Sequence, residues 1–393
     1  MLTLDDLRAT VSRLRREVYG GPVEQVGPQL EALVDAEAAL ATAEAAVRPK
    51  TKGGLLFTTE GDSRTLGFDT TGLEAECRLR MAQVPTAVAH LLDIAANPLV
   101  TCSVQNGSTA TRRVRVASFV EGYSAHAIDT FEIKSGKSHQ FDQLPTFFPD
   151  RLSGLSELTK ATLHIQVDDL DGKVELHRTQ HIWLLPRTTA PLALKDPVTG
   201  DWRDLTRYLG AFVTPGAPSL ETLLHSAAEL APGRQFVSYQ AGPGGVGGQV
   251  KALFEALQKQ QVRYVNSVLS FSAEDGLSSQ RVRLPRQTLE SSNANCLDGT
   301  VLFASLLEAI SLHPAIVLVP GHAFVAWQTD PADEGSWKYL ETTLLGKSTF
   351  EEASAVGDQR AAAYMAVATD KPHLFRRWAM HDLRARHGVL PME

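Results

Sequence analysis

A helical pattern that begins at Cys296 constrains the fold of this chain more than any other feature. Apolar side chains recur after it with the spacing of a buried helix face rather than that of a strand. The apolar positions are Leu297, Val301, Leu302, Leu306, Leu307 and Ile310. Asn293 or Asn295 can cap the first turn, and the charge of Asp298 suits the positive end of the helix dipole. Cys296 therefore lies where free backbone N–H groups favour a thiolate and can bind a developing oxyanion.

Short apolar runs follow this helix and predict strands. Residues 315–319 are bounded by prolines and are typical of a buried strand. Residues 322–327 begin with His322, and residues 337–341 end with Glu341. A helix, a turn and a strand separate Cys296 from His322, so the chain can fold back and bring the imidazole to the sulfur.

A thiol, an imidazole and a carboxylate in this order are the groups of a cysteine nucleophile, its base and its orienting acid. Glu341 can accept the second ring N–H of His322 and fix its tautomer. Asp330 and Asp333, in the loop before the last strand, are alternative carboxylates. Taken singly, each of these residues also fits a plain structural role, such as a buried cysteine or a turn histidine.

Three segments carry a resemblance to a known family. They are Asn295-Cys-Leu-Asp-Gly299, Val319-Pro-Gly-His-Ala-Phe324 and Tyr339-Leu-Glu-Thr-Thr343. They resemble the transglutaminase-like superfamily of papain-like cysteine enzymes, and most closely a bacterial branch of it. Further similar segments lie at 249–257, 262–266, 283–290 and 382–391. The resemblance implies Cys296 as the nucleophile, His322 as the base and Glu341 as the third member, where the family usually has Asp.

The rest of the chain predicts an α+β multidomain protein. Residues 1–52 carry helical stripes and form an N-terminal segment that docks on the next domain or recruits a partner. Residues 53–187 contain β-rich runs between Gly and Asp turns, which favours an antiparallel, immunoglobulin-like β-sandwich. Residues 188–204 have the composition of a linker. Residues 205–393 are then the transglutaminase-like, papain-like α/β catalytic domain that the resemblance implies.

Composition argues against several classes of partner. The net charge of −7 disfavours nucleic acid and anionic membranes. No apolar run has membrane-spanning length, and the acidic, amphipathic start of the chain is unlike a signal peptide. Cys77, Cys102 and Cys296 are widely spaced and odd in number, so we expect no disulfide framework and a reducing cytoplasm.

A glycine run offers an alternative function. Gly242, Gly244 and Gly247 fit the dinucleotide fingerprint, since a strand is predicted at 235–239 and a helix at 250–260. However, the series of parallel β-α units that such a fold requires is missing. We therefore expect a loop that leads into the helix and borders the substrate cleft, and we expect no cofactor.

A metal site is a second alternative. His177 and His181 are four residues apart on a predicted strand, hence on one face. Solvated surface histidines are the commoner explanation of such a pair. Asp168, Asp169 and Asp171 begin like a calcium loop, but the ligand spacing stops there and a hairpin turn fits better. We therefore expect no metal.

The sequence predicts a cysteine protease or amidase that acts on a protein or peptide. His322 would take the proton of Cys296, and the thiolate would attack an amide carbonyl. Backbone N–H groups at the helix start would hold the oxyanion, with Gln287 as an additional side-chain donor. Water would then release the thioester. A protein transamidase, which passes the acyl group to an amine, would use the same residues.

Two further hypotheses belong to other classes. One is a non-catalytic binding or scaffold module in which the three side chains are idle. The other, by analogy with the bacterial branch, is a regulated effector of a stress or defence system. In that case residues 1–187 would bind a regulatory protein and control access to the cleft.

Overall fold

The computed structural model describes most of the chain. The described residues are 3–20, isolated positions between 29 and 43, 55–58, 72–171, 174–195, 200–265, 277–369, 371 and 374–392. They form several sheets and helices, which confirms the predicted α+β class. The chain divides into two compact units: unit 1 is Met1–Lys50, Leu209–Val268 and Val282–Glu393, and unit 2 is Thr51–Tyr208 and Leu269–Arg281. No helix among the described residues is long and apolar enough to cross a membrane.

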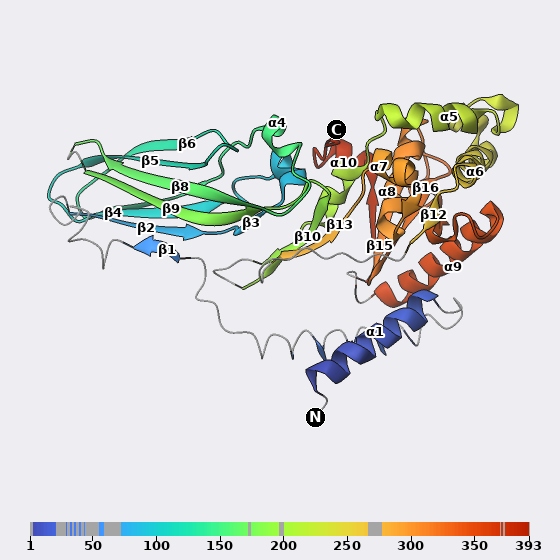
Figure 1. Ribbon diagram of the computed structural model, residues 1–393, viewed down its shortest axis with the longest axis horizontal. Helices are drawn as coiled ribbons and strands as arrows, with labels where there is room; N and C mark the ends of the chain where they lie inside the picture. The colour runs from blue at the N-terminus through green and yellow to red at the C-terminus, as the bar shows by residue number, and fades with distance from the viewer. Residues whose placement is uncertain are drawn as a thin grey trace. The chain divides into compact units, whose positions relative to one another are not determined.

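The first sheet of unit 2 is antiparallel throughout, with the order β1-β2-β4-β7 (Figure 1). Its strands are β1 (Leu55–Thr58), β2 (Leu73–Leu79), β4 (Val100–Asn106) and β7 (Ser138–Gln143). Every second side chain of β2 is buried, which is the period expected of a strand with one face on a core. Cys77 of β2 is paired directly with Cys102 of β4.

The second sheet of unit 2 has the order β3-β9-β8-β5-β6. Its strands are β3 (Gln83–Val84), β5 (Arg112–Val120), β6 (Ala127–Ile133), β8 (Thr159–Asp169) and β9 (Val174–Leu184). β3 and β9 pair in parallel, and the other neighbours are antiparallel. One short helix, α4 (Pro149–Leu152), precedes β8.

Part of the segment predicted as a linker is a strand. β10 (Thr189–Lys195) pairs with β11 (Trp202–Asp204) and with β13 (Leu277–Arg281). Pro191 lies inside β10 and cannot donate to the ladder, but the register shifts between Pro191 and Ala193. A proline is tolerated at such an irregularity, and this is why its presence did not exclude a strand.

The sheet of unit 1 has the antiparallel order β17-β16-β15-β18. Its strands are β15 (Pro314–Val319), β16 (His322–Gln328), β17 (Trp337–Leu340) and β18 (Arg376–Ala379). Helix α8 (Cys296–Ala309) packs against β15 and β16, and α9 (Phe350–Ala368) packs against β17 (Figure 1). The helix at 296 and the three strands after it follow the sequence prediction.

The N-terminal helix α1 (Leu4–Gly20) belongs to unit 1. Val11 and Leu14 of α1 share a buried cluster with Val317 of β15, Phe324 of β16 and Tyr364 of α9. The predicted helix forms, but it docks on the sheet of unit 1 rather than, as predicted, on the β-rich domain that follows it in sequence. Most of the second predicted stripe, near residues 30–45, lies outside the described residues.

Further helices and one small sheet complete unit 1. The helices are α5 (Glu221–Ala228), α6 (Pro243–Lys259), α7 (Pro285–Ser291) and α10 (Met380–Ala385). β12 (Arg263–Tyr264) and β14 (Asn293–Ala294) form a two-stranded parallel sheet. Of these elements, α6, α7 and β14 contact α8. The pairing of β12 with β14 holds Tyr264 next to the residues that lead into Cys296.

Candidate active site

Cys296 is the first residue of α8, and its position is fixed by a capping box. The Asn295 side-chain oxygen accepts from the N–H groups of Leu297 and Asp298, at 2.9 and 2.8 Å. The Asp298 carboxylate accepts in return from the Asn295 N–H at 3.2 Å, and Arg283 Nη1 lies 3.0 Å from the same carboxylate. Of the two capping residues considered, Asn295 is thus the one that caps the helix.

This cap changes the predicted oxyanion site. Two of the first N–H groups of α8 are consumed by Asn295, and the Gly299 N–H donates to the Asn295 carbonyl. Among the residues that the structure describes, the Cys296 N–H is the one of this first turn left without a capping acceptor. The helix start therefore offers a single backbone donor beside the thiol rather than the several expected.

A two-residue turn determines the position of His322. Pro320 and Gly321 connect β15 to β16, and Gly321 adopts a φ of 70°, the left-handed conformation that glycine tolerates. Val319 pairs with His322 across this turn. The Pro-Gly dipeptide therefore determines that the imidazole lies at the very start of β16.

His322 interacts with both of the other predicted residues. Its Nε2 lies 2.8 Å from Glu341 Oε2, and its imidazole forms a side-chain hydrogen bond with Cys296. Because Nε2 faces the carboxylate, Nδ1 is the ring nitrogen that remains for the thiol. The structure thus brings all three predicted side chains together, with the histidine in the middle.

The electrostatics of the histidine and the glutamate favour an ion pair. Both side chains are almost wholly buried, with 7% of His322 and 1% of Glu341 exposed. Burial acts to lower the pKa of His322, but the Glu341 charge and the hydrogen bond with Cys296 outweigh it and raise the pKa to about 9. Burial likewise acts to raise the pKa of Glu341, but His322 and Arg360 outweigh it and lower the pKa to about 2.

The Glu341 carboxylate is held at both oxygens. Oε1 accepts from the Thr343 N–H at 3.1 Å and from the Thr343 hydroxyl at 2.7 Å. Oε2 faces His322, and Arg360 Nε of α9 lies 3.1 Å from it. The Arg360 contact lacks hydrogen-bond geometry, so we treat it as an ion pair that acts through charge. Glu341 therefore has little freedom to turn away from the imidazole.

Arg360 is a residue that the sequence did not point to. Its side chain is 6% exposed, and its Nε and Nη1 have no hydrogen-bond partner among the described residues. A buried guanidinium is unfavourable unless a negative charge compensates it. The compensating charge here is Glu341, which places Arg360 behind the carboxylate as a supporting cation.

Helix α9 approaches the strand that leads to Glu341 very closely at Gly357. A Cβ added to Gly357 would lie 2.7 Å from the Leu340 N and from the Tyr339 carbonyl carbon. The Tyr339 N–H also donates to Asp358 of α9 at 3.1 Å, and the Glu341 N–H donates to the Ala353 carbonyl at 3.1 Å. The distance between α9 and β17 is thus set by the absence of a side chain at 357.

The other candidate site residues have local roles. Gln287 lies in α7, where its side-chain oxygen accepts from the Leu284 N–H at 3.1 Å and caps that helix. Asp330 and Asp333 organise the turn before β17, through bonds to Ala332 and Gly335 N–H groups of 2.9 and 2.8 Å. Of the carboxylates considered as the third member, Glu341 is the one that contacts His322.

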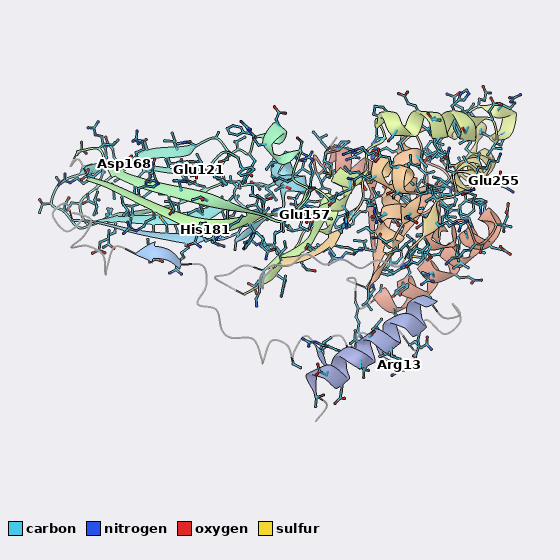
Figure 2. All side chains as sticks on the ribbon, in the orientation of Figure 1. Arg13, Glu121, Glu157, Asp168, His181 and Glu255 are labelled. Atoms are coloured by element: carbon cyan, nitrogen blue, oxygen red, sulfur yellow. The ribbon has the colours of Figure 1, made fainter. Side chains whose placement is uncertain are left out.

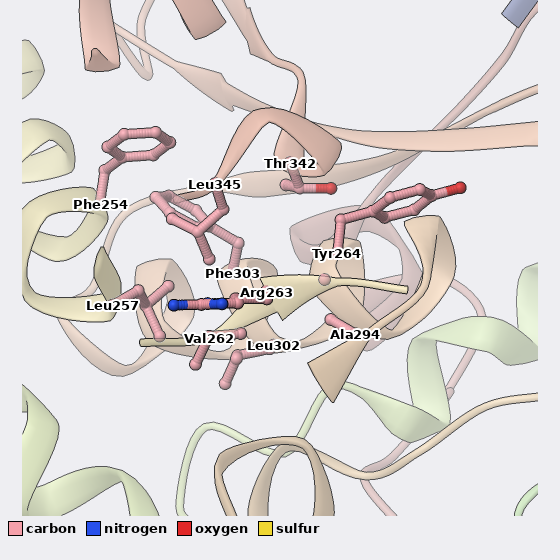
Figure 3. A pocket seen from close by; sticks show the side chains of 11 residues that line it. Phe254, Leu257, Val262, Arg263, Tyr264, Ala294, Leu302, Phe303, Thr342 and Leu345 are labelled. Atoms are coloured by element: carbon pink, nitrogen blue, oxygen red, sulfur yellow. The ribbon is translucent and has the colours of Figure 1, made fainter. Parts of the chain in front are cut away.

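A narrow apolar pocket lies among the elements around α8 (Figure 3). It is lined by Phe254, Leu257, Val262, Arg263, Tyr264, Ala294, Gly299, Leu302, Phe303, Thr342 and Leu345. Its volume is about 330 Å³ when the open mouth is included. Thr342 directly follows Glu341, and Ala294 and Gly299 lie on either side of Cys296 in sequence, while Cys296, His322 and Glu341 are not themselves among the lining residues.

Tyr264 connects this pocket to the charges of the site. Burial, followed by the charges of Cys296 and Glu341, raises the pKa of Tyr264 to about 12. The phenol therefore stays protonated at neutral pH. Lys347 Nζ lies 5.4 Å from the centre of its ring, within the range of a cation–π contact.

The predicted dinucleotide fingerprint is not formed. The residues predicted as a strand at 235–239 are irregular and lead into a 3-10 turn, η7 (Ser238–Ala241). The Gln249 side chain explains the error, because its Oε1 accepts from the N–H groups of Val237 and Ser238, both at 2.9 Å. These N–H groups are thereby withdrawn from any sheet. Gly244 and Gly247 lie inside α6 rather than in a phosphate-binding loop before it.

The histidines and aspartates of unit 2 that could suggest a metal site contact neighbouring side chains and do not converge on one point. Among the described residues, no group of three or more His, Cys, Asp or Glu side chains is placed to hold a metal ion. His177 Nε2 lies 2.9 Å from His164 Nδ1 on the neighbouring strand. Asp168 pairs with Arg115, with Nη2 2.6 Å from Oδ2. His181 and Asp168 lie well apart on the sheet (Figure 2).

Comparison with known proteins adds little to this geometry. No family model matches the chain, and no curated protein matches it. One solved structure that is similar in part is a FixG-related protein from Vibrio parahaemolyticus, at 14% identity. The match covers 28% of this chain and 94% of that protein, with a TM-score of 0.20. A likeness this weak carries no argument about fold or function.

Proposed function

We propose that the protein is a cysteine protease or amidase of the transglutaminase-like fold, with an immunoglobulin-like sandwich as unit 2. The single observation that carries the proposal is the position of His322, which contacts Cys296 on one side and Glu341 on the other. A buried imidazole joined to a thiol and to a carboxylate is the arrangement that activates a sulfur nucleophile.

The first half of the reaction forms a thioester. The Cys296 proton is held on His322 Nδ1, and the sulfur attacks the carbonyl carbon of an amide as a thiolate. The negative oxygen of the tetrahedral intermediate binds the Cys296 N–H at the positive end of α8. His322 then donates its proton to the nitrogen of the leaving amine, and the C–N bond breaks.

The second half returns the enzyme to its starting state. A water molecule gives a proton to His322 and adds to the thioester carbonyl. The C–S bond breaks, the carboxylic acid leaves, and the thiolate is again paired with the protonated imidazole. Throughout both halves Glu341 holds the ring in one tautomer and stabilises its positive form, while Thr343 and Arg360 hold Glu341.

The pocket beside the site supports a preference for an apolar substrate group. Its walls include Phe254, Leu257, Leu302 and Phe303, and Figure 3 shows these side chains away from the Tyr264 hydroxyl. The enclosed space holds little more than a water molecule, so a small apolar side chain of a peptide would enter only when these walls move apart. We propose that they do so on substrate binding, and we expect cleavage sites with an apolar residue near the scissile bond.

The test is a comparison of peptide products. Wild type and Cys296→Ala are incubated with the same proteome-derived peptide mixture, and new termini are identified by mass spectrometry over time. We expect new termini with wild type alone, enriched for apolar residues near the cleaved bond. A parallel sample with a labelled primary amine detects transfer of the acyl group in place of hydrolysis. Identical profiles for wild type and Cys296→Ala, without amine incorporation, would contradict the proposal.

A further inference from the structure

The two remaining cysteines are neighbours in unit 2 although they are far apart in sequence. Cys77 of β2 and Cys102 of β4 are directly opposite in an antiparallel ladder, and their Sγ atoms are 2.7 Å apart. Unbonded sulfur atoms do not ordinarily approach one another this closely. The distance is still longer than the roughly 2.0 Å of a covalent S–S bond, so the pair is reduced as it stands.

We propose that Cys77 and Cys102 form a dithiol site that a disulfide reagent closes into a cross-strand disulfide. The backbone already meets the requirement, since opposite residues of an antiparallel pair have Cα atoms about 4.5 or 5.5 Å apart. Disulfides span Cα distances of about 4.4–6.8 Å. The spacing of the two strands therefore already suits the bond.

The chemical step needs a named partner. Oxidised glutathione is attacked by one thiolate of the pair, which forms a mixed disulfide and releases one reduced glutathione. The second sulfur attacks the mixed disulfide, and a second reduced glutathione leaves. Two S–H bonds are lost and one S–S bond forms in the protein, and the two protons and two electrons are carried by the two glutathione molecules.

Burial determines when this step can occur. Both side chains are 0% exposed, on the face that also carries Ala75, Val100 and Val104. The hydrogen bond with Cys77, and then burial, raise the pKa of Cys102 well above its usual value, which keeps the Cys102 thiol protonated in the folded protein. Exchange therefore proceeds when the sheet opens or while it folds, and the finished disulfide is shielded from reductants.

The test measures the state of the pair in the full-length Cys296→Ala chain, in which no third thiol can react. The protein is held in oxidised glutathione, both folded and during refolding from denaturant, then quenched with acid, denatured and alkylated. We expect a species two hydrogen atoms lighter that takes up no alkyl group, with the peptides of Cys77 and Cys102 joined. Two alkylated cysteines, or two glutathione adducts, under both conditions would overturn the proposal.

A second measurement, of the melting temperature, does not depend on the activity proposed for Cys296. In otherwise wild-type protein, the oxidised pair should raise the melting temperature by roughly 5 °C or more over the reduced pair, because the bond restricts the unfolded chain. The Cys77→Ser/Cys102→Ser variant should show no effect of oxidant. A melting temperature that responds to oxidant in that variant as it does in wild type would place the effect at Cys296 and contradict the assignment.

Discussion

Arg360 Nε lies 3.1 Å from Glu341 Oε2, the oxygen that also faces His322. Glu341 is thus shared between two cationic partners, one from the sheet and one from α9. This relationship links the stability of unit 1 to the chemistry proposed for Cys296.

Replacing the buried cation should weaken both the fold and the site. Arg360→Met removes one of the charges that compensate Glu341, and removing one member of a buried pair costs about 3 kcal/mol of unfolding free energy. Urea denaturation measures this loss. The same variant should alkylate more slowly at Cys296, because a less firmly held Glu341 orients His322 less well.

A matched control separates the two effects. Arg384 forms a more exposed ion pair with Glu308, Nη2 to Oε2 at 3.0 Å, and donates to backbone carbonyls, without touching the three central residues. Arg384→Met should lower the unfolding free energy but leave the alkylation rate of the folded protein at the wild-type value. Equal loss of alkylation rate in both arginine variants would show that Arg360 acts only through stability.

Glu341→Gln should shift the pH dependence of the site. The carboxylate raises the pKa of His322 to about 9, against an ordinary value of about 6.5. A raised pKa means that the charged histidine stabilises the folded state at low pH and that this contribution is lost as pH rises through about 9. Without the carboxylate, burial acts against fewer opposing interactions and lowers the pKa of His322, so the alkaline limb of activity should move from near pH 9 to lower pH.

The pH profile of activity or of Cys296 alkylation tests this shift. Glu351→Gln is the control, since Glu351 is an exposed acid paired with Lys251 at 2.6 Å, and its profile should match wild type. An alkaline limb that stays in place in Glu341→Gln would mean that the carboxylate does not control the protonation of His322. At the other extreme, Glu341 contributes stability above its unfolded pKa, and wild type should lose that part as pH falls through about 2.

Gly357→Ala should destabilise unit 1 despite the higher helix propensity of alanine. The added methyl group would meet the backbone of Tyr339 and Leu340 at 2.7 Å, and such overpacking costs about 1–3 kcal/mol. The forced separation of α9 from β17 should also displace Glu341 and lower activity. Gly247→Ala, in α6 with open space around the new Cβ, should be neutral or stabilising by up to about 1 kcal/mol. Similar urea midpoints for the two variants would refute the steric argument.

Asn295→Ala should loosen the start of α8. It removes the acceptor of the Leu297 and Asp298 N–H groups, a loss worth about 1–2 kcal/mol of unfolding free energy. Asn295→Asp keeps an acceptor at this position and should recover most of that loss. If the two variants unfold at the same urea concentration, the cap does not stabilise the helix.

The sequence predicted those parts of unit 1 whose signals are local. The apolar spacing after Cys296 predicted α8, and the Pro-Gly turn predicted where His322 begins its strand. The contact between His322 and Glu341 could be anticipated because His322 begins β16, Glu341 directly follows β17, and these consecutive strands are antiparallel.

Features that depend on long-range packing could not be predicted in this way. Arg360 lies in a helix rich in alanine and charge, where nothing marks one arginine as buried. The pairing of Cys77 with Cys102 depends on the register of two strands that are 25 residues apart. The strand expected at 235–239 failed because the Gln249 side chain, from a neighbouring helix, binds its N–H groups.

The most direct test of the central claim is the rate at which iodoacetamide alkylates Cys296 at neutral pH, measured by intact-mass spectrometry on folded protein. If His322 and Glu341 activate the sulfur, wild type should react at Cys296 at least roughly tenfold faster than His322→Ala, because the neighbouring imidazolium favours the thiolate. The shielded Cys77 and Cys102 should stay unmodified over the same time. Equal rates in wild type and His322→Ala, or a Cys296 that does not react, would contradict the account.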